Sequence, residues 1–258
     1  MSIKKKTNKG FITNYLKMNN EFIKGVLDAK LSNLLNENDF LTFAGLSNAE
    51  KLNFFINNGL VSTSIVTNFE ALCKNALNDL KKEIQSYLES DTLYVNYFFA
   101  KDYISRDIEA LHLFYEDIYL KAKERDDTWL LFYLDLKFSL LNVLSITRAK
   151  KRGDDTSSIR NLYLWQSIMS EEVYISLINS DRSTLVSYVK NTFNIDLYDT
   201  DNNRVIEEKL DAYLFIKVKD LAIEGDLLPT LIYYIKMKKY EITRLRDIYY
   251  TGRNKAHG

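Results

Sequence analysis

Proline and glycine are scarce in this sequence, whose 258 residues include one proline and eight glycines. Both residues are typical of tight turns and β-bulges, and proline also interrupts helices. Their scarcity argues against a sheet-rich fold with many short connections and favours long helices. Because 46% of the residues are hydrophobic, the chain can bury a sizeable core, so a disordered chain is not the default interpretation.

Cysteine and histidine are also rare, with one cysteine, Cys73, and two histidines, His112 and His257. One cysteine cannot form an internal disulfide, and these three residues cannot build an ordinary structural zinc site. Basic and acidic residues number 35 each, so net charge does not favour nucleic acid or an anionic membrane surface as a partner. We expect a reducing compartment, no cofactor, no metal and no nucleic-acid partner.

Catalytic motifs are missing as well, since the sequence holds no glycine-rich phosphate loop, no dinucleotide fingerprint and no HExxH helix. His112 and Cys73 lie in helical patterns without a nucleophile motif, so both are expected to pack rather than react. The adjacent acids at 126–127 and 154–155 are expected in solvated turns, not as a catalytic pair. We expect a protein that is not an enzyme, and an active site within a helical bundle is the least favoured alternative.

One apolar run, Trp129 to Ile146, just reaches the length of a membrane span. It contains Asp135, Lys137 and Asn142, and a charge near the centre of a span costs about 2.5–3.5 kcal/mol on insertion scales. We therefore expect a helix buried in the core of a soluble protein. No apolar stretch of signal-peptide length follows the first lysines, which predicts a cytoplasmic location and no transmembrane helix.

Apolar residues recur at three- and four-residue spacing along most of the chain, which predicts an all-α fold. Ser47 and Glu50 form a capping-box pattern at the start of one short helix, and Gly153 after a basic run predicts a left-handed helix end within a loop at Arg148–Ser158. We expect helices at Phe11–Leu35, Ser47–Ile56, Ser64–Leu88, Leu93–Lys123, from Trp129 onward, Glu171–Asn179, Ser183–Phe193, Arg204–Ile223 and Leu228–Tyr250.

The best candidate linker is the turn-rich segment Asn191–Asn203. We expect an N-terminal helical lobe at 1–112, a middle helical lobe at 113–195, and a C-terminal helical hairpin at 196–258 that packs on the other lobes. A weak internal repeat is also present, because two patterns share one spacing: Phe99, Asp102, Ile108 and Leu111, and then Phe132, Asp135, Leu141 and Leu144. Any amphipathic helix produces such a pattern, so the spacing taken alone favours chance over true repetition.

The last expected helix carries the candidate partner-binding surface. Its apolar stripe comprises Leu231, Tyr234, Ile235, Ile242, Leu245 and Ile248, which we expect to be buried. The charged residues Lys238, Glu241, Arg244 and Arg246 are expected to project away from that stripe and to contact a partner protein. The alternative is a solvated face on which Glu241 pairs with Arg244.

Two segments resemble a known family, the C-type subunits of the V-type ATPases and ATP synthases, which in eukaryotes are the d-type subunits. The tail from Tyr234 to Ile248 resembles the closing helix of that family through Tyr234, Lys238, Glu241, Ile242, Leu245, Arg246 and Ile248. The run from Tyr133 to Gly153 resembles a repeated helix of the family that ends in Arg-Ala-Lys and a glycine, here Arg148, Ala149, Lys150 and Gly153. Phe99 to Leu111 looks like a more degenerate copy of the same helix.

The resemblance implies a funnel-like array of repeated helical lobes that binds the membrane proteolipid ring and receives the central-stalk subunits. Such a protein would transmit torque during proton or sodium transport, peripheral to the cytoplasmic face of the membrane, without catalysing a reaction. Members of the family are typically longer, so a reduced middle lobe is expected here. The alternative is a helical scaffold or adaptor protein unrelated to rotary ATPases.

Overall fold

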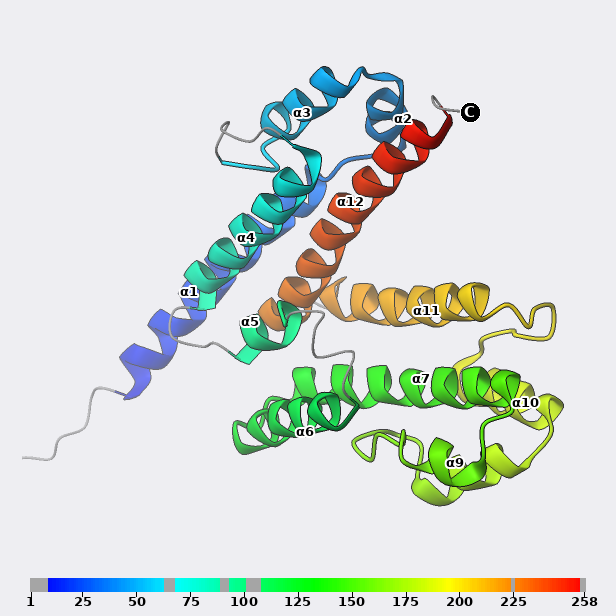
Figure 1. The fold of residues 1–258 in the computed structure, drawn as a ribbon. Helices are drawn as coiled ribbons and strands as arrows, with labels where there is room; N and C mark the ends of the chain where they lie inside the picture. The colour runs from blue at the N-terminus through cyan, green and yellow to red at the C-terminus, as the bar shows by residue number, and fades with distance from the viewer. Residues whose placement is uncertain (1–8, 63–67, 89–92, 101–107, 224–225, 256–258) are drawn as a thin grey trace, which may run out of the picture. The chain divides into compact units, whose positions relative to one another are not determined.

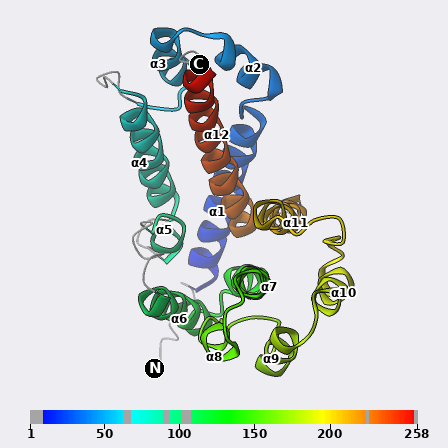
Figure 2. The same ribbon diagram turned by 45° about the vertical axis from the view of Figure 1, so that its right-hand side comes forward.

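The computed structural model describes residues 9–62, 68–88, 93–100, 108–223 and 226–255. Within these ranges the chain forms twelve helices and no strand, which confirms the all-α prediction (Figures 1 and 2). The low content of proline and glycine is the simplest physical reason, because few positions interrupt a helical hydrogen-bond ladder.

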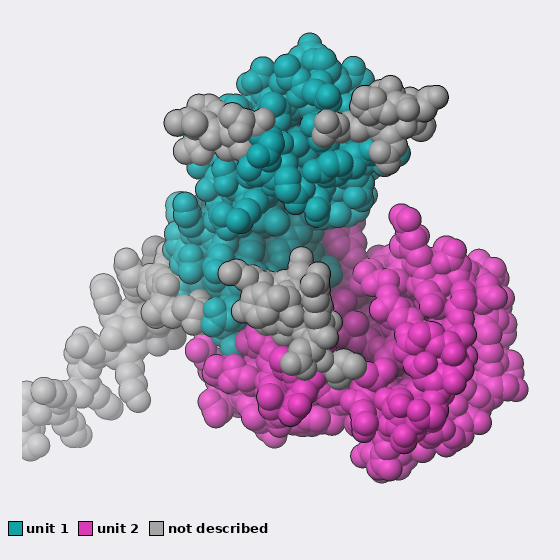
Figure 3. Space-filling view, viewed as in Figure 1, with its two compact units in different colours: residues 1–99, 222–258 teal, residues 100–221 magenta. Residues whose placement is uncertain are grey.

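The chain divides into two compact units (Figure 3). Unit 1 combines residues 1–99 with 222–258, and unit 2 is the continuous segment 100–221. This division differs from the three segments expected at 1–112, 113–195 and 196–258. The expected C-terminal hairpin is split, because its second helix packs with the first helices of the chain while its first helix belongs almost wholly to unit 2.

Unit 1 is built around its last helix, which contacts three helices from the beginning of the chain. Its helices are α1 (Lys9–Ser32), α2 (Glu37–Gly45), α3 (Asn48–Asn57), α4 (Phe69–Leu88), α5 (Leu93–Phe98) and α12 (Leu227–Lys255). Both ribbon views place α12 alongside α1 and α4 (Figures 1 and 2). Residues from the two ends of the chain therefore form one core.

Local capping signals set the short helices of unit 1. Ser47 and Glu50 form the predicted capping box, with the Ser47 N–H donating to Glu50 Oε2 at 2.8 Å. A second box at Asn36 and Asp39 begins α2 and was not predicted. After α3, Gly59 has φ +64°, a left-handed conformation that glycine adopts without a steric penalty.

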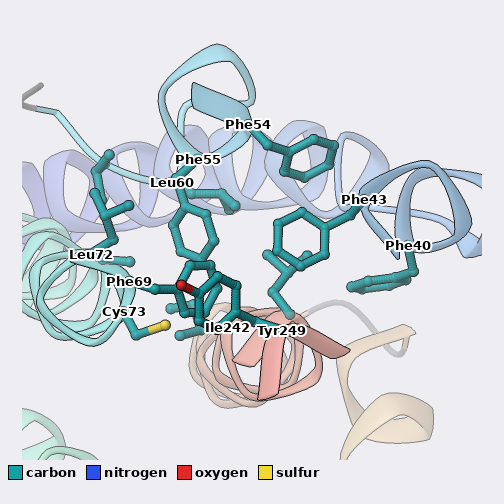
Figure 4. Packing of buried hydrophobic residues seen from close by; sticks show 13 residues of the cluster. Phe40, Phe43, Phe54, Phe55, Leu60, Phe69, Leu72, Cys73, Ile242 and Tyr249 are labelled. Carbon is teal, nitrogen blue, oxygen red and sulfur yellow. The ribbon is translucent and has the colours of Figure 1, made fainter. Parts of the chain in front are cut away.

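Aromatic side chains fill the core of unit 1 (Figure 4). The rings of Phe55 and Phe69 meet edge to face with centroids 5.2 Å apart, and Phe43 lies near both. Tyr249 of α12 stacks on Phe69 with centroids 3.9 Å apart and planes within 4°. Helices α2, α3, α4 and α12 are thus joined by one cluster, in which Cys73 also packs.

Unit 2 is organised by one long helix, which contacts three of its neighbours in the chain. The helices of unit 2 are α6 (Ile108–Glu124), α7 (Thr128–Arg152), α8 (Thr156–Arg160), α9 (Glu171–Asn179), α10 (Arg182–Phe193) and α11 (Asn203–Ile223), of which α11 ends in unit 1. α7 packs with α6, α8 and α9.

The predicted loop at Arg148–Ser158 is wrong for most of its length. α7 continues to Arg152 and ends, as predicted, with Gly153 in the left-handed conformation at φ +73°. A short helix, α8, then begins at Thr156, because the Asp155 carboxylate accepts the Ser158 N–H and caps it. Asp154 and Asp155 thus lie in the turn between the two helices, as predicted, and Asp155 also caps α8.

The single helical region predicted at Leu93–Lys123 is interrupted. α5 ends at Phe98 and α6 begins at Ile108. Residues 101–107, including Asp102 of the internal repeat, lie outside the described residues, as does His257.

α7 is long and apolar enough to cross a membrane by length and composition. Of the 18 consecutive residues of α7 that are most apolar, 61% are buried inside the protein. This is typical of a core helix. Two of its buried polar residues are satisfied by one segment of unit 2. Ser139 Oγ accepts the Ile168 N–H at 2.8 Å, and the Asn142 amide exchanges hydrogen bonds with both main-chain groups of Leu164 at 2.9 Å.

Candidate partner-binding surface on the C-terminal helix

The apolar stripe of α12 is buried as predicted. Leu231, Tyr234, Ile235, Ile242 and Leu245 lie in the interior, and Ile248 is half-buried against the aromatic cluster. Pro229 lies in the first turn of the helix, where its missing N–H has no intrahelical partner to lose. The stripe fixes the rotation of α12 and so decides where its charged residues point.

The prediction that Glu241 projects away from the stripe is wrong. Its side chain is 1% exposed. Oε1 accepts the main-chain N–H of Leu35, just beyond α1, at 2.5 Å, and Oε2 accepts Lys238 Nζ at 2.7 Å. The carboxylate therefore satisfies a backbone donor 206 residues away, a contact that no local spacing could reveal.

Arg244 also binds within unit 1. Its guanidinium forms two parallel hydrogen bonds to the Glu37 carboxylate, each 2.5 Å long, and lies 4.2 Å from the centroid of the Phe40 ring. The hydrogen bonds from Arg244 lower the pKa of Glu37 below its usual value. The alternative pairing of Glu241 with Arg244 is therefore not formed, and Arg244 instead fastens α12 to α2.

Arg246 forms the one pair of this set in which both side chains are about half exposed. Its Nη2 lies 3.0 Å from Glu70 Oε1, and Tyr250 donates a hydrogen bond to Glu70 Oε2 at 3.2 Å. The exposed fractions are 52% for Arg246 and 54% for Glu70. Of the predicted surface, this α4–α12 pair is the part most open to a partner.

A second, partly buried polar centre near α12 was not predicted. Glu83 of α4 accepts hydrogen bonds from the hydroxyls of Tyr87 and Tyr234 at 2.9 and 3.0 Å. Lys30 Nζ of α1 lies 3.0 Å from Glu83 Oε1. Burial is the main cause that raises the pKa of Tyr234, with the Glu83 charge adding to it. One carboxylate thus links α1, α4 and α12. Only the helical spacing of Glu83 and Tyr87 was readable from the sequence.

The second family-like segment, Tyr133 to Gly153, forms most of α7 in unit 2. Ala149 is fully buried, and Arg148 Nη2 lies 2.5 Å from Glu207 Oε2 of α11. Lys150 Nζ donates to the main-chain carbonyls of Ile178 and Ser180, at the end of α9. Burial raises the pKa of Asp135 within the same helix. The Arg-Ala-Lys string therefore joins three elements of unit 2.

The geometry offers little for catalysis in the described part of the chain. Burial raises the pKa of the Cys73 thiol to about 12, which keeps it protonated and unreactive near neutral pH. Burial lowers the pKa of His112, which is half-buried. Among the described residues, no group of three histidine, cysteine or acidic side chains is placed to hold a metal ion.

A cavity of about 320 Å³ lies beside Lys238 in unit 1, lined in part by Asp79 and Glu83. Both acids are engaged, since Asp79 accepts two hydrogen bonds from Ser62 and Glu83 is held by the tyrosine hydroxyls. The cavity therefore presents satisfied polar groups, and the charged face of α12 remains the candidate site.

Comparison of the sequence with known protein families and with curated proteins finds no match.

Proposed function

We propose that this protein is the non-catalytic rotor-coupling subunit of a V-type ATPase or ATP synthase. It links the central-stalk subunits to the membrane proteolipid ring during proton or sodium transport, on the cytoplasmic face of the membrane. The observation that carries the proposal is the joint occurrence of two family-like strings, Tyr234 to Ile248 and Arg148 to Gly153.

The all-helical architecture supports this role on mechanical grounds. A protein that transmits torque needs stiff elements, and α1, α7, α11 and α12 each span more than twenty residues. The proposed form is the funnel-like array of helical lobes implied by the resemblance, with a reduced middle lobe. Polar, solvent-facing side chains suit contacts between partners that fold separately and meet in water.

The structure narrows the proposed contact surface. Glu241 and Arg244 are used within unit 1, whereas the Arg246–Glu70 pair is open to solvent. We therefore assign the partner contact to Arg246 of α12 and Glu70 of α4, with Lys238 and Arg244 at its margin.

The function is tested by affinity purification of the tagged protein from its native membranes in a gentle detergent. The expected result is recovery of proteolipid-ring and central-stalk subunits, identified by mass spectrometry. An unrelated tagged helical protein is the control for nonspecific capture. If neither set of subunits is recovered, the proposal is wrong.

The surface is tested by a charge exchange. In E70R/R246E the internal ion pair is kept but the sign at each position is reversed, so stability should be close to that of the wild type. If Arg246 and Glu70 contact the rotor, both R246E and the exchange variant lose the co-purifying subunits. If the pair acts only within unit 1, the exchange variant restores whatever R246E loses.

The alternative function is a helical scaffold or adaptor unrelated to rotary ATPases. The internal contacts of α12 favour it, because Glu241 and Arg244 are explained by folding alone. In that case affinity purification recovers partners without a role in ion transport.

A further inference from the structure

Unit 2 contains a cavity of about 440 Å³ whose lining is basic. It lies between the last turns of α7, the start of α10 and the start of α11. Its polar lining comprises Thr147, Lys150, Lys151, Ser180, Arg182, Asp201 and Asn203, and apolar side chains including Leu185 and Ile206 complete it. The volume falls within the range of small-molecule sites. We call it the basic cavity.

The three cations of the basic cavity are held by neutral acceptors. Lys150 Nζ donates to the carbonyl of Ile178 at 2.8 Å and also to that of Ser180, and Lys151 Nζ donates to the carbonyl of Asp201 at 3.3 Å. Arg182 donates to the carbonyls of Leu197 and Thr200. These bonds fix the side chains without neutralising their charge.

Acidic side chains offset only part of this charge. Within the described residues, none of the three cations forms an ion pair with a carboxylate, and Asp201 is the one acid in the lining. Asp181 also acts on Lys150, but its carboxylate is occupied by Ser183 and Thr184 at the start of α10. Burial lowers the pKa of Lys150, so a bound anion would stabilise its charged form.

Asn203 adds an independent polar requirement. Its Oδ1 is buried and has no hydrogen-bond partner among the described residues, and Asn203 lines the cavity at the start of α11. An unpaired buried acceptor carries a desolvation cost that a ligand hydroxyl or amine would remove. The lining therefore combines fixed positive charge with one acceptor that lacks a donor.

We propose that the basic cavity binds the phosphate group of a small molecule that also carries a hydrogen-bond donor. Lys150, Lys151 and Arg182 would contact the phosphate oxygens, because charge-assisted hydrogen bonds to lysine and arginine are the strong ones in phosphate recognition. Asn203 would accept the donor, and the apolar side chains would cover the carbon skeleton. This site does not depend on the rotor-coupling function.

The test is isothermal titration calorimetry of the full chain with inorganic phosphate and with glycerol 3-phosphate, which adds hydroxyl donors to the same anion. We expect saturable binding at one site and tighter binding of glycerol 3-phosphate. Lys151→Gln should weaken both ligands about tenfold, the effect of losing one charge-assisted hydrogen bond. Arg204→Gln is the matched control, because this exposed arginine on the first turn of α11 does not line the cavity and pairs with Glu208.

The outcomes separate the parts of the proposal. Absence of binding, or equal loss in Lys151→Gln and Arg204→Gln, would overturn the site. Equal affinity for the two phosphates would overturn the role of Asn203, whereas Asn203→Ala should remove the preference if that role is right. Binding to phosphatidylcholine vesicles that contain phosphatidate, without binding of glycerol 3-phosphate, would assign the phosphate to a lipid headgroup.

Discussion

At the scale of single residues, Glu241 shows that a charged residue of a helix can serve folding rather than partner binding. The sequence places it among four charges on one helix, but the structure buries it against the main chain after α1. A buried donor that loses its acceptor costs more than an exposed ion pair contributes. Glu241 therefore contributes to stability. Its neighbours Arg244 and Arg246 carry the opposite charge and are also more exposed.

We predict that Glu241→Ala lowers the free energy of unfolding by about 2–3 kcal/mol, because the Leu35 N–H and Lys238 both lose their acceptor. Glu241→Gln should cost about half as much, since its carbonyl oxygen can still accept the Leu35 N–H. Urea denaturation measures both. Asp247→Ala is the matched control, because Asp247 is exposed on the same helix. Equal effects of Glu241→Ala and Asp247→Ala would contradict the structural role.

The buried thiol of Cys73 predicts a pH dependence. Its pKa is about 12 in the folded protein, against about 8.5 for an unfolded cysteine. Below pH 8.5 both states hold the proton, so its contribution is fully present. As the pH rises toward 12, the unfolded state loses the proton first and stability falls.

The comparison is the urea midpoint of wild type and Cys73→Ala at pH 8 and pH 10. Wild type should lose more stability than the variant across this interval. The buried tyrosines with raised pKa values, such as Tyr234, contribute a loss of the same sign to both proteins. An identical loss in the two proteins would show that Cys73 is not shielded from solvent.

At the scale of elements, sequence patterns located helices where the deciding contacts are local. The Ser47–Glu50 box, the left-handed Gly153 and the α12 stripe each depend on residues within a few turns of one another. The position of Glu241 and the pairing of Arg244 with Glu37 depend on packing between distant segments. α8 was missed because Asp155 caps a helix of only five residues, which offers no periodicity.

The polar residues buried in α7 position the segment that follows α8. We predict that Asn142→Leu destabilises the protein by about 2–3 kcal/mol, because both main-chain groups of Leu164 lose their partner. Ser139→Ala should remove only the acceptor of the Ile168 N–H. Hydrogen exchange distinguishes the two, since Asn142→Leu should expose the Leu164 amide and Ser139→Ala the Ile168 amide. The same amide responding to both variants would contradict these assignments.

At the scale of the whole molecule, unit 1 is assembled from both ends of the chain and unit 2 lies between them in sequence. The aromatic cluster of α2, α3 and α4 receives Ile242, Leu245 and Tyr249 from α12. Loss of this one helix should therefore disrupt a core whose other residues lie far away in the sequence.

We predict that Leu245→Asp disrupts unit 1, because Leu245 is fully buried and an unpaired charge there has no partner. Thr243→Asp is the matched control, since Thr243 is exposed on the same helix. Hydrogen exchange should show lost protection in α1, α4 and α12 while α7 and α9 stay protected. Equal loss in both units would mean that they unfold as one cooperative structure.

The discontinuity of unit 1 also has a consequence during translation. The segment that carries Phe43, Phe55 and Phe69 leaves the ribosome before all of unit 2, and α12 follows only afterwards. At ordinary elongation rates this delay is on the order of 10 s, long compared with hydrophobic collapse. Throughout that interval the nascent chain presents an aromatic surface without its final helix, which makes it a natural substrate for a ribosome-associated chaperone.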